Sequence, residues 1–218
     1  MIREIDIDEI SDGLRYNKDS LVKIGCNDCK GCSDCCRGMG DSIILDPYDI
    51  YSLSAGTGMD FGTLMNGFIT LNVVDGIIMP NIKMREDTEG CGFLREDGRC
   101  SIHEYRPGFC RLFPLGRIYE NGSFTYFNQI HECNYPNKTK VKVKNWLGIP
   151  SLGEYEKYIN AWHDFIKNMQ EKIKNNSNDE YIKNLNMMIL NKFYVLPYDK
   201  SVSFYEQFYY RMEICMQE

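Results

Sequence analysis

The segment that decides the fold spans residues 26–36 and reads CNDCKGCSDCC, with cysteine at every third position from Cys26 to Cys35 and a final pair, Cys35–Cys36. Only small, polar or charged residues separate the thiols. A single cysteine usually behaves as a small buried apolar residue, but five cysteines in eleven residues do not fit that role. Gaps of two residues let neighbouring sulfur atoms converge on one centre, as in zinc sites and iron–sulfur clusters. The segment therefore predicts a loop folded around a metal.

Length and composition predict a folded protein that does not bind nucleic acid. The chain has 218 residues, of which 43% are apolar, so it can bury a sizeable core. Its net charge of -6 argues against a phosphate-backbone partner. The first ten residues lack the basic start and apolar stretch of a signal peptide, and no apolar run approaches the roughly 18 residues of a membrane span. We therefore expect a cytoplasmic protein with reduced thiols and no membrane contact, rather than a secreted chain with disulfides.

The first half of the chain predicts one strand and two short helices. Apolar residues alternate within residues 1–24, which indicates a strand leading into the cysteine loop. Asp46 is a suitable N-cap, Pro47 fits the first helical position, and Asp49 faces the positive end of the helix dipole. Glycines end that helix, and Asp60 can cap a second one.

Three dipeptides of the kind that forms tight hairpin turns stand between apolar flanks. They are Asp75–Gly76, Asp97–Gly98 and Asn121–Gly122, and the predicted hairpins span residues 72–79, 91–102 and 115–127. The middle hairpin carries Cys91 and Cys100 on its two arms. Closing it would bring these two thiols together as a ligand pair.

Four further cysteines form a second candidate group, since Cys110 and Cys133 follow the middle hairpin. Two groups of four thiolates could build two zinc sites, ligate two cubane clusters or surround one larger site. The predicted ligands are Cys29, Cys32, Cys35, Cys36, Cys91, Cys100, Cys110 and Cys133, with Cys26 as an additional candidate. The triple two-residue spacing favours one or two 4Fe-4S clusters, with zinc as the alternative.

Cationic and imidazole groups stand beside these cysteines. Arg106 and Arg111 flank Cys110, and their guanidinium groups could offset the negative charge of a thiolate-bound metal or form ordinary ion pairs with acidic residues. Arg117 is a third such arginine. His103 and His131 fit hydrogen bonding to a thiolate better than ligation. No catalytic residue can be assigned, because the sequence shows no nucleophile–base pair, phosphate loop or dinucleotide motif.

The composition changes after a basic run at residues 137–144, and helical spacing of apolar residues follows. We expect an α+β protein in which residues 1–144 form an irregular, hairpin-rich metal domain with short helices. Residues 145–218 would add amphipathic helices packed on it. Within this extension, Cys215 is expected in the core and His163 on the surface.

Four separated blocks carry a family resemblance. They are CKGCSDCC at residues 29–36, CGFL at 91–94, GRCSI at 98–102 and RPGFCRLFP at 106–114. Together they resemble the YkgJ-like cysteine-cluster family, whose CxxCxxCC domain is associated with chelation of zinc or iron. A similar pattern occurs in flagellin lysine methylases, which the resemblance connects with an iron–sulfur cluster. This chain shows no Gly-rich loop after a strand that would indicate a methyl-donor site.

Two classes of function remain open at this point. In the first, an iron–sulfur centre takes part in electron transfer, redox chemistry or modification of a protein or peptide, and the helical extension recognises that partner. In the second, closed four-thiolate zinc sites stabilise the fold, and the protein is an interaction module.

Overall fold

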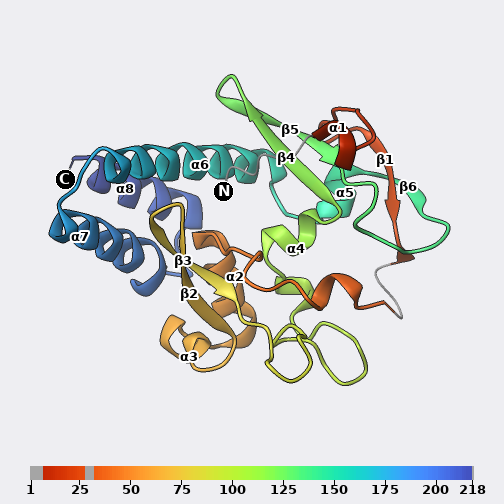
Figure 1. Ribbon diagram of the computed structural model, residues 1–218, viewed down its shortest axis with the longest axis horizontal. Coiled ribbons are helices and arrows are strands. Elements are labelled where there is room, and N and C mark those ends of the chain that lie inside the picture. Colours follow the sequence, from red (N-terminus) through yellow and green to blue (C-terminus); the bar gives the residue numbers. More distant parts are fainter. Residues whose placement is uncertain (1–6, 28–31, 218) are drawn as a thin grey trace.

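Three two-stranded antiparallel sheets and a group of helices make up the computed structural model, which describes residues 7–27 and 32–217 (Figure 1). The sheets pair β1 (Leu21–Gly25) with β6 (Thr139–Lys142), β2 (Ile69–Val74) with β3 (Ile77–Ile82), and β4 (Leu115–Glu120) with β5 (Ser123–Asn128). The short helices are α1 (Ile7–Ile10), η2 (Asp34–Cys36), α2 (Pro47–Thr57), α3 (Phe61–Met65), η3 (His103–Tyr105), α4 (Gly108–Leu112) and α5 (Val143–Leu147). The long helices α6 (Leu152–Lys174), α7 (Asp179–Leu190) and α8 (Phe204–Gln217) follow, with a π-helical turn η4 (Asn191–Val195) after α7. The α+β prediction is confirmed.

The outer two predicted hairpins are confirmed. At both turns the two central residues, Asp75–Gly76 and Asn121–Gly122, have φ between 48° and 87°, as a two-residue turn matched to the strand twist requires. The middle hairpin is confirmed in shorter form. The Arg95 N–H donates to the Arg99 carbonyl and the Ser101 N–H to the Phe93 carbonyl, both at 2.9 Å, around an antiparallel bridge between Leu94 and Cys100. The pairing covers residues 93–101 rather than the predicted 91–102.

Helix α2 begins with the predicted cap. The Asp46 side chain accepts from the Asp49 backbone N–H at 2.9 Å, and the Asp49 side chain accepts from the Asp46 N–H at 3.0 Å. This reciprocal capping box satisfies two donors that a helix start otherwise leaves unpaired. The helix ends at Gly58, whose φ of 75° suits glycine.

The pairing of β1 with β6 was not predicted. In the basic run at residues 137–144 lysines alternate with Thr139, Val141 and Val143, which is the pattern of a strand with one buried face, and Val141 lies opposite the buried Val22. Lys23 and Lys140 face each other on the exposed side of this ribbon. Cys26 directly follows β1, and the pairing of β1 with β6 brings the segment after Cys133 close to Cys26.

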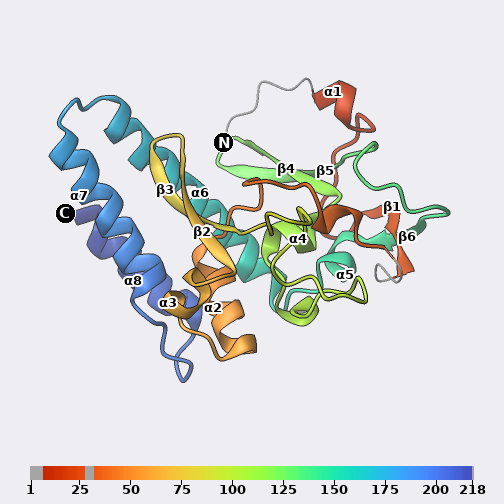
Figure 2. The same ribbon diagram turned by 60° about the horizontal axis from the view of Figure 1, so that its bottom comes forward.

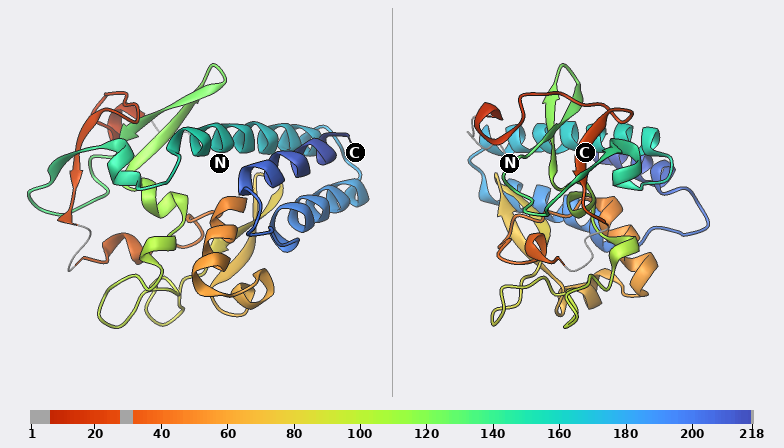
Figure 3. Two further views of the ribbon diagram at one scale, coloured as in Figure 1. Left: turned by 180° about the vertical axis from the view of Figure 1, so that it is seen from behind. Right: turned by 90° about the vertical axis from the view of Figure 1, so that its right-hand side faces the viewer.

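The C-terminal helices pack on the hairpins through one hydrophobic core. Figure 3 shows α6, α7 and α8 side by side at one end of the molecule. Trp162 of α6 contacts the rings of Phe193 and Phe208, with centroids 5.1 and 6.0 Å apart. The same core cluster includes Val22 of β1 and Cys215 of α8, which is 1% exposed as predicted. Across residues 7–27 and 32–217, no helix is long and apolar enough to cross a membrane.

Candidate metal centre

Eight cysteines from distant parts of the sequence line a single cavity of about 100 Å³. They are Cys26, Cys32, Cys35, Cys36, Cys91, Cys100, Cys110 and Cys133. Cys26 is buried, and the other seven are partly exposed. The described members of the two groups that the spacing suggested therefore meet at one place, together with Cys26. Cys29 lies outside the described residues.

A backbone hydrogen bond joins the first cysteine block to the second. Cys35 and Cys36 lie on the single turn η2, and the Cys91 N–H donates to the Cys36 carbonyl at 2.8 Å. A second bond, from the Gly38 N–H to the Glu89 carbonyl at 2.9 Å, continues this contact. The thiols of these two segments are consequently held at one wall by main-chain bonds.

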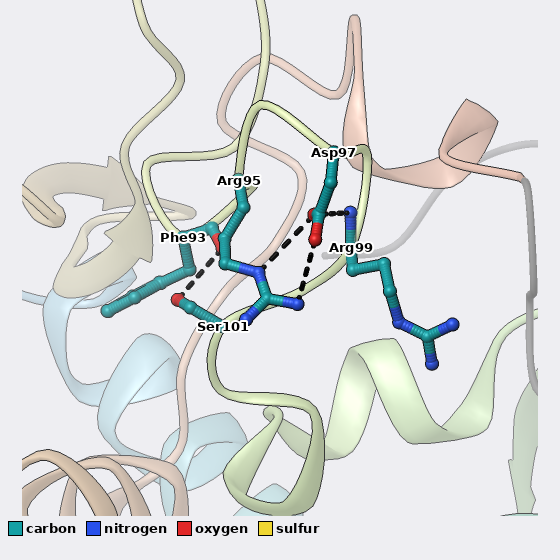
Figure 4. Close-up of polar contacts among 5 residues, drawn as sticks. All are labelled: Phe93, Arg95, Asp97, Arg99 and Ser101. Atoms are coloured by element: carbon teal, nitrogen blue, oxygen red, sulfur yellow. Dashed lines mark hydrogen bonds and ion pairs between the residues drawn. The ribbon is translucent and has the colours of Figure 1, made fainter.

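Side-chain contacts support the turn and the base of the short hairpin at residues 93–101 (Figure 4). Arg95 forms an ion pair with Asp97 at 3.1 Å, and the Arg99 N–H donates to the same carboxylate at 2.9 Å. At its base, the Ser101 hydroxyl donates to the Phe93 carbonyl at 2.9 Å. The Arg99 side chain extends away from these contacts in Figure 4 and lines the cavity.

A buried carboxylate fixes the helix that carries Cys110. The Gly108 N–H, in the first turn of α4, donates to Asp49 Oδ1 at 2.7 Å. Gly108 leaves no room for a side chain, since an added Cβ would lie 2.2 Å from the Tyr155 hydroxyl oxygen. Helix α4 is therefore held against the start of α2 and against α6, and Cys110 is positioned from both sides.

The two arginines expected near the centre occupy different places. Arg106 lines the cavity, and its Nη1 contacts His103 Nε2. Arg111 does not line it. Its guanidinium instead donates to backbone carbonyls of the adjoining loops, those of Glu104, Arg106, Leu147 and Gly148.

The thiols influence one another electrostatically. Burial raises the pKa of Cys110 well above its usual value, and the neighbouring Cys91, Cys100 and Cys35 raise it further. Burial likewise raises the pKa of Cys91 and that of Cys100, and Arg106 partly opposes the shift at Cys100. A hydrogen bond with Cys36 raises the pKa of Cys35 most, and burial of the thiol raises it further. A positive metal centre would reverse this preference for the protonated thiol, because a coordinating thiol is deprotonated.

The chemistry of this donor set fits a thiolate-bound zinc ion or iron–sulfur cluster. Both take four cysteine ligands, and the cavity offers twice that number. Within residues 7–27 and 32–217, no three His, Cys, Asp or Glu side chains already form a compact group that could hold a metal ion.

Other residues at the cavity were not predicted from the sequence. Trp146 of α5 and Tyr135 line the cavity. In the sequence both follow Cys133 and lie far from the other cysteines of the cavity. Arg99 could have been identified from its position next to Cys100. Trp146 could not, because its place depends on the unpredicted β6 and on its indole N–H donating to the Phe113 carbonyl at 3.1 Å.

Three other predicted residues lie away from the cavity lining. His131 is exposed on the turn after β5. His163 is half-buried rather than on the surface as expected, because its ring stacks on Tyr119 with centroids 3.6 Å apart. Arg117 of β4 lines a different cavity, between β4 and α6.

A family model matches residues 28–139, and its description is "Putative zinc- or iron-chelating domain", CxxCxxCC. The matched region includes seven of the eight cysteines at the cavity, all except Cys26. Neither a curated protein nor a solved structure matches the chain.

Proposed function

Because this chain belongs to the CxxCxxCC family of zinc- or iron-chelating domains, we propose that it is an iron–sulfur protein whose 4Fe-4S cluster has a redox role. The observation that carries the proposal is the convergence of eight cysteines on one cavity. A structural zinc site needs four closed ligands. The excess of thiols over these four suits a centre that exchanges electrons or meets a substrate.

We assign one cluster to Cys35, Cys91, Cys100 and Cys110. Each of these thiols lines the cavity. Negative charge on Cys35, Cys91 or Cys100 raises the pKa of Cys110, and negative charge on Cys35 raises the pKa of Cys100. The four thiols are therefore electrostatic neighbours. The bond from the Cys91 N–H to the Cys36 carbonyl and the bond from the Gly108 N–H to Asp49 hold the segments that carry these thiols. Cys26, Cys32, Cys36 and Cys133 remain at the same cavity as ligands of a second cluster or as exchange partners.

The surrounding residues would tune such a centre. A bound cluster supplies one-electron redox chemistry, with a potential that depends on nearby charge and hydrogen bonding. Arg106 lies close enough to influence Cys35 and Cys100 electrostatically, so its positive charge favours the thiolate form and the more reduced state. The cavity lining carries two arginines, Arg99 and Arg106, and two acidic residues, Asp34 and Glu132, so its charge does not select an acidic or a basic protein or peptide partner.

We place this chemistry in a reducing compartment such as the cytoplasm. Among the described residues, none of the seven partly exposed thiols at the cavity forms a disulfide. Reduced thiols are the form that ligates metal, and the cytoplasm maintains them.

Metal and acid-labile sulfide analysis of the full chain, purified without oxygen, tests the proposal. We expect iron and sulfide in equal amounts, with visible absorption that bleaches on reduction. Cys35→Ser should lose most of the iron, whereas Cys215→Ser, in the core of α8 and away from the cavity, should keep it.

Zinc without sulfide would overturn the redox proposal and leave the alternative, a structural zinc protein. That alternative has its own support, because the same four thiols would complete a closed tetrahedral site. Full metal content in Cys35→Ser would instead show that the ligand assignment is wrong.

A further inference from the structure

Positive charge is concentrated in the two segments that form and flank the ribbon of β1 and β6. Residues 11–27 and 134–148 together contain seven Lys and Arg residues and two Asp residues, a net charge of +5. The rest of the chain has 18 Lys and Arg residues and 29 Asp and Glu residues, a net charge of -11. Figure 2 shows the ribbon at one end of the molecule and α7 and α8 at the other. An acidic protein therefore carries a basic surface at one end.

The lysines of the ribbon share its exposed face. Lys23 of β1 lies directly opposite Lys140 of β6, and Lys142 lies opposite Leu21. All four of these side chains are exposed, whereas Val22 on the other face is buried. Like charges at directly opposite positions of an antiparallel pair are destabilising. The ribbon therefore keeps an arrangement that costs stability, and an anionic partner would offset that cost.

The two acidic residues of these segments do not neutralise the exposed face. The Asp12 carboxylate already accepts a hydrogen bond from a tyrosine hydroxyl at 2.6 Å. Asp19 pairs with Lys144 at 2.8 Å, and Lys144 lowers its pKa most, followed by Lys18 and Lys142. One carboxylate is thus shared among three lysines, and the lysines of β1 and β6 form no ion pair with any residue that the structure describes.

The size and composition of this face favour a protein over other anionic partners. Leu21 is 58% exposed among the lysines, and an apolar side chain within a charged rim is the arrangement of protein interfaces. Neither β1 nor β6 contains an aromatic residue on which a nucleic-acid base could stack. Strand β1 has 5 residues, a length of about 17 Å. A phosphate backbone or an anionic membrane would extend beyond it onto the acidic remainder of the chain.

We propose that the exposed face of the β1–β6 ribbon, formed by Leu21, Lys23, Lys140 and Lys142, docks the acidic surface of a partner protein. Cys26 directly follows β1, so a docked partner lies beside the cysteine cavity. Small interfaces steered by charge are typical of transient electron-transfer complexes. That the partner exchanges electrons rests on the proposed redox function, whereas the docking itself does not depend on which metal occupies the centre.

Fluorescence anisotropy of a labelled peptide of ten glutamates, titrated with the full metal-containing chain, tests the proposal. We expect saturable binding that weakens at least about 10-fold between about 20 and 200 mM NaCl, because salt screens exposed charges. Lys140→Glu should weaken binding at least about 10-fold, since it replaces attraction with repulsion. Lys200→Glu makes the same change at an exposed position before α8 and should leave the affinity unchanged.

The Lys140→Glu variant also separates docking from folding. It places opposite charges at facing positions of the ribbon, so the urea midpoint of unfolding should rise while the affinity for the peptide falls. If this variant does not fold, Lys142→Glu, which lies opposite Leu21, gives the same binding test.

Absence of saturable peptide binding, or an unchanged affinity in the folded variant, would overturn the proposal. Tighter binding of a ten-residue oligothymidylate or of phosphatidylglycerol vesicles would also overturn it and assign the face to nucleic acid or to a membrane. The peptide titration decides the docking surface whether metal analysis finds iron or zinc, so its failure is distinguishable from failure of the redox proposal.

Discussion

Replacing Gly108 with alanine tests how α4 is held at the cysteine cavity. The new Cβ would lie 2.2 Å from the Tyr155 hydroxyl oxygen, well inside contact distance. Tyr155 is 1% exposed, so its ring cannot move into solvent. Overpacking of this kind costs about 1–3 kcal/mol, against a gain of about 0.4–1 kcal/mol from a less flexible unfolded chain. We expect Gly108→Ala to lower the free energy of unfolding by about 1–2 kcal/mol.

A second substitution should rescue the first. The Tyr155 hydroxyl is buried, and its polar neighbour is the Arg117 guanidinium. Tyr155→Phe removes the clashing atom and leaves no new unpaired group on the ring. The next atoms, Tyr155 Cζ at 3.5 Å and Asp49 Oδ1 at 3.6 Å, are in ordinary contact with the added Cβ. The double variant should recover at least about 1 kcal/mol relative to additivity, within the range for contacting residues.

Urea unfolding of the four proteins, followed by circular dichroism at matched metal content, measures this coupling. Metal content is a second readout, since Cys110 lies two residues beyond Gly108. It should fall in Gly108→Ala and return in the double variant. Strictly additive stabilities would refute the clash as the cause, and so would a metal content that Tyr155→Phe does not restore.

Three further predictions concern the centre and its support. Cys35→Ser should weaken metal binding about 100-fold, a loss of about 2.7 kcal/mol, which is about a quarter of the roughly 10–16 kcal/mol with which a four-thiolate site binds its metal. Cys215→Ser should leave the metal affinity unchanged. Competition with a chelator measures both affinities. Burial and the adjacent Asp46 raise the pKa of Asp49 above 3.8, so its stabilising contribution is present at lower pH and lost as pH rises through the folded-state pKa. The stability difference between the unmodified protein and Asp49→Asn should then shrink as pH rises from about 4 in urea titrations, and a growing difference would contradict this sign. Arg111→Met removes the donor to several backbone carbonyls and should cost about 2 kcal/mol, which lowers Tm by about 4–8 °C; an unchanged Tm would count against that role.

Local features of the fold could be predicted from the sequence because short-range chemistry determines them. The cap of α2 depends on Asp46, Pro47 and Asp49, which are close in the chain, and the structure contains the expected reciprocal bonds. The turns at Asp75 and Asn121 follow from residues that tolerate positive φ. The Asp97–Gly98 turn carries the same type of dipeptide and also reverses the chain, but the paired arms are short, and side-chain contacts of Asp97 add to the few backbone bonds.

Long-range contacts could not be predicted in the same way. Nothing in the basic run around Lys140 indicates that it pairs with Lys23, more than a hundred residues earlier. The meeting of the two cysteine groups at one cavity depends on this pairing and on the Cys91–Cys36 bond. Spacing therefore identified candidate thiols but not how they are grouped.

The start of α2 supports two distant parts of the fold, helix α4 and helix α6. Asp49 holds Gly108, and with it the helix of Cys110, across 59 positions of sequence. Asp46 lines the cavity of Arg117 and accepts a hydrogen bond from Tyr158 of α6. An exposed helix cap typically contributes about 1 kcal/mol. Here both side chains also make long-range bonds, so the same pair that begins a helix positions the segment of a candidate metal ligand and anchors α6.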